Sequence, residues 1–157
     1  GAGDDLAKDI AALTAAKDEY LALAQRTQAD FENYRKRAVK DVRAAEERGM
    51  AKLARELLPA LDNLHLALDR SGEDSGQGGA LVEGVRLVLG ELTAALARAG
   101  IEAYAPHGEA FDPTVHEAVA QRPAADGETA GTVVEVMQQG YRHGETVLRP
   151  ARVLVAG

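Results

Sequence analysis

The chain contains no cysteine and no tryptophan, and aromatic residues make up only 4% of it. Without cysteine it can form no disulfide, no thiolate zinc site and no cysteine nucleophile. The same lack fits a reducing compartment, so we expect a cytoplasmic protein. The scarcity of aromatic side chains argues against one large core. No apolar run approaches the ~20 residues that span a bilayer, so we predict no membrane association.

Proline is also missing from residues 4–58, and that stretch holds a single glycine. Apolar or small side chains recur there at alternating steps of four and three, which is the spacing of a coiled-coil seam. They are Leu6, Ile10, Leu13, Tyr20, Ala24, Thr27, Phe31, Tyr34, Ala38 and Ala45. Lys17 and Asp41 interrupt the seam. We therefore predict a helix over residues 1–58, roughly 80 Å long, that pairs with another helix, most simply that of a second copy.

Two shorter apolar stripes follow. Pro59 removes a backbone donor, so we expect a kink or break there and a second, short helix over residues 59–70. A Gly- and Ser-rich connector (71–79) leads to an amphipathic helix that ends before Gly100. Two such helices cannot bury both stripes alone, but two copies of the pair would form a four-helix bundle. The residues predicted to pack in this bundle are Leu61, Leu64, Leu68, Gly84, Val85, Leu89 and Leu92.

Helical periodicity stops after Gly100, and four of the five prolines lie in or flank the segment beyond it. Candidate strands there are residues 102–105, 117–121, 132–139 and 147–155, with a hairpin-like turn at 142–145. The predicted fold class is α+β. Its parts are a coiled-coil helix (1–58), two short bundle helices (59–100) and a small all-β domain (101–157).

The net charge of −7 is concentrated in the second half of the chain. Residues 1–70 hold 12 Lys and Arg against 13 Asp and Glu, whereas residues 71–157 hold 6 against 12. This balance argues against a nucleic-acid partner, which needs a basic footprint. One basic cluster does stand on the long helix, at Arg35–Arg37 with Lys40 and Arg43. A solvated face with ion pairs four residues apart would explain it without any partner.

Several blocks of sequence, spaced in order, carry a specific resemblance. In the last third they are Phe111-Asp112-Pro113, His116, Ala118-Val119, Gly140-Tyr141 and Val147-Leu148-Arg149-Pro150-Ala151-Arg152-Val153-Leu154-Val155. Upstream they are Phe31-Glu32-Asn33-Tyr34-Arg35-Lys36-Arg37, Leu57-Leu58-Pro59-Ala60-Leu61-Asp62-Asn63-Leu64 and Val82-Glu83-Gly84-Val85. Together they resemble the GrpE family, the nucleotide-exchange partners of DnaK-type chaperones.

The resemblance implies a parallel homodimer with two β-domains as wings. One wing would pack on the nucleotide-binding domain of a DnaK-type chaperone and favour its open cleft, so that ADP leaves. It also implies that the weak coiled-coil seam acts as a thermal sensor. The residues whose positions match the chaperone-facing surface are Arg35, Lys36, Phe111, Met137 and Val155.

Pattern and resemblance leave some roles open. Met137 is expected on the exposed face of a strand with Val133 and Glu135, opposite Val134 and Val136. Phe111 and Val155 suit a core equally well. Gly84 costs an isolated helix about 1 kcal/mol relative to alanine, which close packing in the bundle would explain.

The sequence predicts no catalytic, metal or cofactor site. The four histidines have no metal-ligand spacing, and His116 is expected to form a structural hydrogen bond. Asp112-Pro113 is expected to form a turn. Two alternatives to nucleotide exchange remain: a structural coiled-coil adaptor whose β-head binds another protein, and a nucleic-acid-binding coiled coil that uses the basic cluster.

Overall fold

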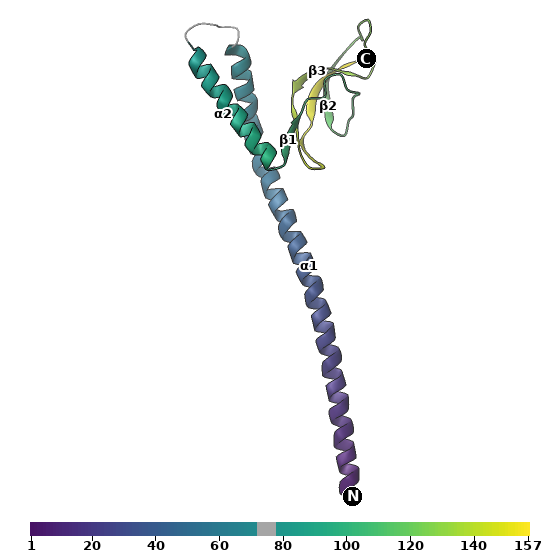
Figure 1. Ribbon diagram of the computed structural model, residues 1–157. Coiled ribbons are helices and arrows are strands. Elements are labelled where there is room, and N and C mark those ends of the chain that lie inside the picture. The colour runs from purple at the N-terminus through teal and green to yellow at the C-terminus, as the bar shows by residue number, and fades with distance from the viewer. Residues whose placement is uncertain (72–77) are drawn as a thin grey trace. The chain divides into compact units, whose positions relative to one another are not determined.

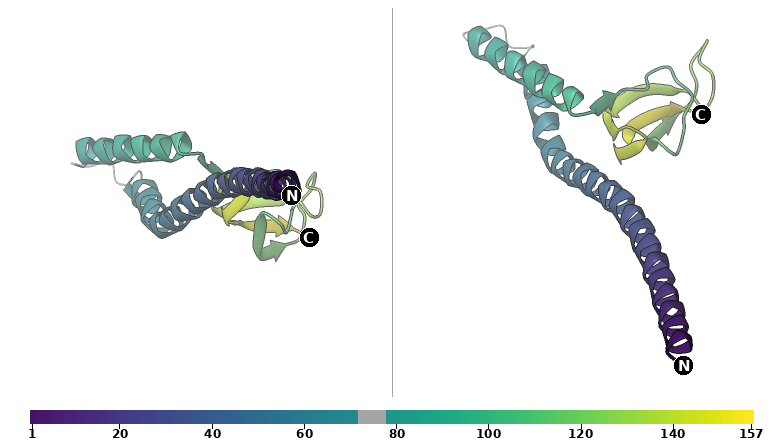
Figure 2. Two further views of the ribbon diagram at one scale, coloured as in Figure 1. Left: turned by 90° about the horizontal axis from the view of Figure 1, so that it is seen from below. Right: turned by 60° about the horizontal axis from the view of Figure 1, so that its bottom comes forward.

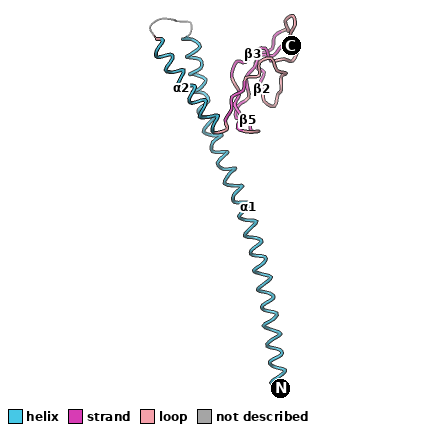
Figure 3. Tube along the Cα trace, viewed as in Figure 1, coloured by secondary structure: helices cyan, strands magenta, loops and turns pink. Residues whose placement is uncertain are grey.

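The computed structural model describes residues 1–71 and 78–157. In this part of the chain, two helices are followed by six strands (Figures 1 and 3). This order confirms the predicted α+β class. The chain divides into two compact units, residues 1–48 and residues 49–157. The predicted connector falls largely on residues 72–77, which lie outside the described residues.

The first unit consists of the N-terminal part of helix α1 (Ala2–Ser71), drawn in purple to blue in Figure 1. Within this unit almost every side chain is exposed, because one helix has no interior of its own. The predicted seam is therefore open to solvent, with Leu13, Tyr20 and Phe31 among its large exposed side chains. Pairing of this seam with another helix stays a prediction.

Of the kink or break predicted at Pro59, the break is wrong. Helix α1 runs through the proline to Ser71, so residues 59–70 are its last turns and not a separate helix (Figure 2). Proline removes one backbone hydrogen bond from the helix. Packing offsets this loss, because Leu58 and Leu61 on either side of the proline are almost fully buried.

Helix α2 (Gly79–Arg98) carries the second apolar stripe. Leu89 is buried, and Leu92 and Leu96 pack against the same core. The helix ends as predicted: Gly100 adopts a φ of +81°, and its N–H donates to the carbonyl of Ala97 at 2.9 Å. This left-handed conformation is available to glycine without a steric penalty.

The C-terminal part of the chain, residues 101–157, is called the β-head and contains two three-stranded sheets. One has the order β1 (Ile101–Tyr104), β4 (Gly140–His143), β5 (Thr146–Arg149) and is antiparallel. The other has the order β2 (His116–Arg122), β6 (Ala151–Ala156), β3 (Val133–Gln138), with β2 parallel and β3 antiparallel to β6.

Two strand predictions need correction. The predicted strand 147–155 is two strands, β5 and β6, which belong to different sheets and are separated at Pro150. Proline cannot donate to a ladder, so it marks the point where the chain leaves one sheet for the other. The segment Gly140–His143 forms strand β4, which sequence reasoning missed, and the hairpin turn is confined to Gly144 and Glu145.

Two buried clusters hold the second unit together. The helix–sheet core joins α1, α2 and the first sheet through Ala51, Ala54, Leu58, Leu61, Leu89, Ile101, Tyr141 and Leu148. The head core lies in the second sheet and consists of Val133, Ala151, Val153 and Val155, with Tyr104, Phe111 and Val136 against it. The head is therefore packed directly on the last turns of α1. The division predicted at residues 1–58, 59–100 and 101–157 concerns an assembly of two copies and stays a prediction.

Candidate partner-binding surfaces

Met137 lies near the end of edge strand β3 and is 60% exposed, as predicted. It borders a groove of about 400 Å³ between this strand and the last turns of α1, where Leu66 and Val136 supply further apolar surface. An exposed methionine is a flexible apolar contact that can adapt to a partner. This is a candidate docking point for another protein.

The prediction that Val133, Glu135 and Met137 share the exposed face of β3 is wrong for Val133. Val133 is fully buried, whereas Glu135 and Met137 are exposed. The pairing of β3 with β6 shifts register between Val133 and Glu135, and such a bulge breaks the strict alternation of faces. The bulge places Val133 in the head core and leaves Met137 outward.

Phe111 and Val155 are not part of an exposed patch with Met137. Val155 is 7% exposed and belongs to the head core, the alternative that the sequence left open. Phe111 is half-buried and packs against the same core, and the centre of its ring lies 6.0 Å from that of the His116 ring in a tilted arrangement. Both side chains therefore shape the head from within.

His116 forms the structural hydrogen bond that was predicted. Its ring is buried, and its Nδ1 accepts from the backbone N–H of Asp112 at 3.0 Å. The Asp112 carboxylate accepts from the hydroxyl of Thr114 at 2.7 Å and from its N–H at 2.9 Å. These two bonds, the hydroxyl first, hold the pKa of Asp112 below its ordinary value. The Asp112-Pro113 turn leading into β2 is thus confirmed.

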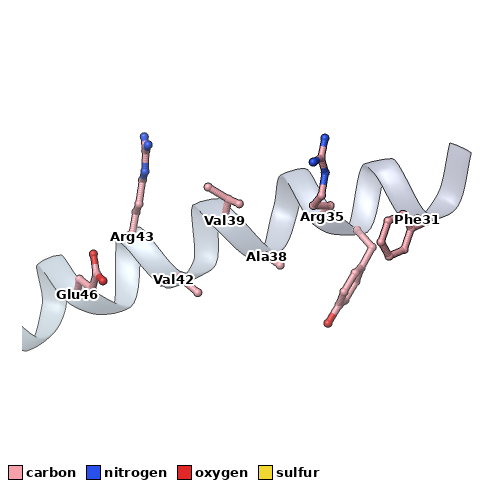
Figure 4. A pocket seen from close by; sticks show the side chains of 8 residues that line it. Phe31, Arg35, Ala38, Val39, Val42, Arg43 and Glu46 are labelled. Carbon is pink, nitrogen blue, oxygen red and sulfur yellow. The ribbon is translucent and has the colours of Figure 1, made fainter. Parts of the chain in front are cut away.

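The basic cluster of α1 is exposed on the first unit. Arg35 and Arg43 project from the same side of the helix with Val39 between them, as Figure 4 shows. Among the described residues, the salt bridges do not include Arg35 or Lys36, so the expected pairing along the helix is not observed. The cluster presents its charge to solvent.

The residues predicted to pack in a bundle divide into two groups. Leu61, Leu64, Leu68, Leu89 and Leu92 all belong to the helix–sheet core of one copy or pack against it. Gly84 and Val85 are not members of that core: a methyl group added at Gly84 would meet nothing within 4 Å. Leu81 (74% exposed), Leu87 and Val88 are exposed on the same helix. One face of α2 is thus apolar and uncovered in the single chain.

Sequence reasoning missed the polar contacts between the head and helix α1, of which the ion pair is the shortest. The guanidinium of Arg149 at the end of β5 forms an ion pair with the carboxylate of Asp62 on α1 at 2.6 Å. Both residues stand in the blocks that carried the resemblance, but 87 positions separate them. No local periodicity relates residues so far apart, so only the fold could pair them.

The described residues contain no cluster of metal-ligating side chains. In residues 1–71 and 78–157, no three His, Asp or Glu side chains gather where a metal ion could be held. Neither described helix combines the length and apolar composition needed to cross a membrane.

The chain matches the GrpE family model over residues 3–157. A GrpE protein of Mesorhizobium japonicum is 45% identical over 138 residues, which is 85% of this chain and 65% of that protein. One of Aliivibrio fischeri strain MJ11 is 41% identical over 131 residues, covering 83% and 67%. One of Cereibacter sphaeroides is 40% identical over 150 residues, covering 94% and 84%. The matched stretch thus spans about two thirds of the length of the first two relatives.

Proposed function

This chain belongs to the GrpE family of co-chaperones, and we propose that it is a nucleotide-exchange factor for a DnaK-type chaperone. As a co-chaperone it acts on another protein and is not itself an enzyme. Its head binds the nucleotide-binding domain of the chaperone in the open-cleft state better than in the closed state. Such differential binding is sufficient to favour opening and to accelerate ADP release. We place the reaction in the cytoplasm.

The observation that carries this proposal is the family match over nearly the whole chain, combined with the exposed Met137 on a packed head. Met137 is proposed as the direct contact. Phe111 and Val155 act from the interior, because both pack in or against the head core formed by residues of β3 and β6. The head thereby presents a preformed surface, which lowers the entropic cost of binding.

A homodimer is part of the proposal. Two uncovered apolar surfaces support it: the seam of α1 in the first unit and the face of α2 around Gly84. A glycine with free space above it lets a second helix approach closely. Two copies would bury the seam by pairing their long helices, and would bury the face of α2 by packing α2 and the end of α1 from each copy into a four-helix bundle.

The test is an exchange assay. Release of a fluorescent ADP analogue from a DnaK-type chaperone is followed with and without the protein in excess. Accelerated release supports the proposal. Binding without acceleration would instead favour the alternative, a coiled-coil adaptor whose head holds another protein.

Arg35 and Lys36 are proposed to contact the chaperone through charge. We expect the double variant Arg35→Glu, Lys36→Glu to slow association about tenfold at low salt, because rim charges chiefly steer encounter. Stopped-flow binding over a salt series measures this. Lys8→Glu with Arg26→Glu, the same reversal of two charges earlier in α1 and away from the seam, serves as the control. If both double variants associate like the parent, the cluster is only a solvated face.

The long helix is proposed to be a thermal sensor. Lys17, Thr27 and Asp41 occupy seam positions where leucine would bury far more apolar surface. We expect circular dichroism to show early, reversible helix loss, followed by a second transition at higher temperature. Lys17→Leu with Asp41→Leu should raise the first midpoint by several degrees and leave the second in place. A single transition that those substitutions do not move would contradict the two-stage scheme.

A further inference from the structure

The carboxylate of Asp62 on α1 joins three elements of the second unit. Its two oxygens accept from both terminal nitrogens of Arg149, at 2.6 Å from Nη1 to Oδ2 and 2.9 Å from Nη2 to Oδ1. Oδ2 also accepts from Nε2 of Gln138 at 2.7 Å. Arg149 ends β5 in one sheet, and Gln138 ends β3 in the other. One helix side chain therefore holds both sheets of the head.

The surroundings of Arg149 make this contact directional. Its Nε and Nη2 also donate to the carbonyl of Gln139, at 3.2 and 2.7 Å. The guanidinium carbon lies 5.3 Å from the centre of the Tyr141 ring. The side chains of Arg149 and Asp62 are only 18% and 27% exposed. A bidentate, partly desolvated pair of this kind constrains geometry far more than an exposed ion pair does.

A second polar contact lies two turns earlier on α1. The Nε of Arg55 donates to the carbonyl of Leu148 at 3.1 Å. Arg55 precedes Asp62 by seven residues, so both stand on one face of the helix. Leu148 and Arg149 are neighbours at the end of β5. Two attachment points along one helix face determine the angle between the head and α1. With a single attachment point, the head could rotate about that point.

The apolar contact alone would not set that angle. The helix–sheet core includes Ala51 and Ala54 facing the head, and burial of apolar surface is non-directional. It keeps the head on α1 but tolerates small rotations. The hydrogen bonds to Asp62 do not, because their strength falls steeply with misalignment.

We propose that Asp62 is a positioning residue: through Arg149 and Gln138 it fixes the angle of the β-head on the last turns of α1, so that binding by the head is converted into opening of the chaperone cleft. This rests on the proposed function. A head that is free to rotate binds the open and the closed cleft with more similar affinities. A ligand with equal affinity for two states does not change the equilibrium between them. Loss of the hydrogen bonds to Asp62 therefore reduces opening of the chaperone cleft more than it reduces binding of the head to the chaperone.

The test uses Asp62→Asn, which keeps the shape and removes the charge, and Arg149→Lys, which keeps the charge and loses the planar fork. Glu56→Gln is the matched control, because it removes the charge of an exposed carboxylate on the same part of α1 and lies outside the groove beside Met137. Thermal unfolding and chaperone affinity are measured for each. We expect both test variants to remain folded and bind within about threefold of the parent, while maximal ADP release slows about tenfold, within the range usual for coupling between sites.

A direct measurement of the angle accompanies the kinetics. Because the sequence has no cysteine, Lys52→Cys on α1 and Asp126→Cys on the head take spin labels specifically. Labelled protein is diluted with unlabelled protein so that distances within one copy dominate. We expect a narrow distance distribution in the parent and in Glu56→Gln, and a broad one in Asp62→Asn.

The outcomes separate this inference from the function on which it rests. A parent protein that fails to accelerate ADP release refutes the exchange function, whatever the distances show. A parent that accelerates release while Asp62→Asn keeps both the narrow distribution and the full rate overturns the positioning role. A rate lost only in parallel with affinity or folding assigns Asp62 to stability alone and also overturns it.

Discussion

Met137→Asp is expected to reduce the acceleration of ADP release by about 10- to 100-fold, because a carboxylate would have to be desolvated in an apolar contact. The side chain projects outward from the end of β3, so the head should fold normally. Exchange is measured at a fixed chaperone concentration over a range of variant concentrations. The loss should appear mainly as weaker binding.

Val119→Asp is the control for this prediction. Val119 is an exposed apolar residue on β2, the opposite edge strand of the same sheet. It receives the same charge at a different surface, so exchange should stay within about twofold, as for ordinary surface substitutions. If Met137→Asp folds correctly and exchanges at the parent rate, or if Val119→Asp loses as much, the docking surface is not at Met137.

Leu81→Glu with Val88→Glu is expected to convert a dimer into monomers at micromolar concentration. Both side chains are exposed in the single chain, so helix α2 should remain intact. In a dimer they would be buried, and two carboxylates per copy facing an apolar partner would oppose association strongly. Sedimentation equilibrium measures the mass, and circular dichroism checks the helix.

Arg86→Glu is the matched control. It introduces glutamate about 140° around α2 from Leu81, away from the uncovered face. The control should sediment as the parent does. A parent protein that is already monomeric at this concentration would contradict the dimer itself.

Whether a helix or strand continues through a proline could not be predicted from the sequence. Pro59 and Pro150 have the same local chemistry, yet α1 continues through the first and the chain changes sheet at the second. Buried leucines flank Pro59 and offset its missing hydrogen bond, whereas Pro150 lies at a strand end where no partner strand needs its donor. The bulge after Val133 is another case, because register depends on the neighbouring strand.

The candidate site could be predicted only where neighbouring residues determine it. The exposure of Met137 followed from a glutamate on its face, and the turn at Asp112 followed from an Asx-Pro pair. The burial of Val155 did not follow, because an apolar residue at a strand end suits a core and an interface equally well. The Asp62–Arg149 pair did not follow either, since its members are far apart in sequence.

The sequence by itself determined the α+β class, the long helix with its weak seam, the cap at Gly100, and the family. Each depends on local propensity, short-range periodicity or ordered motifs, which survive without knowledge of neighbours. Tertiary structure alone decided that α1 extends to Ser71, that the last segment divides between two sheets, and that Asp62 of α1 pairs with Arg149 of the head. These three features depend on burial and on pairing between residues that are far apart in the sequence. Such contacts form only in the folded chain, where their free energy exceeds the local preferences of the residues involved.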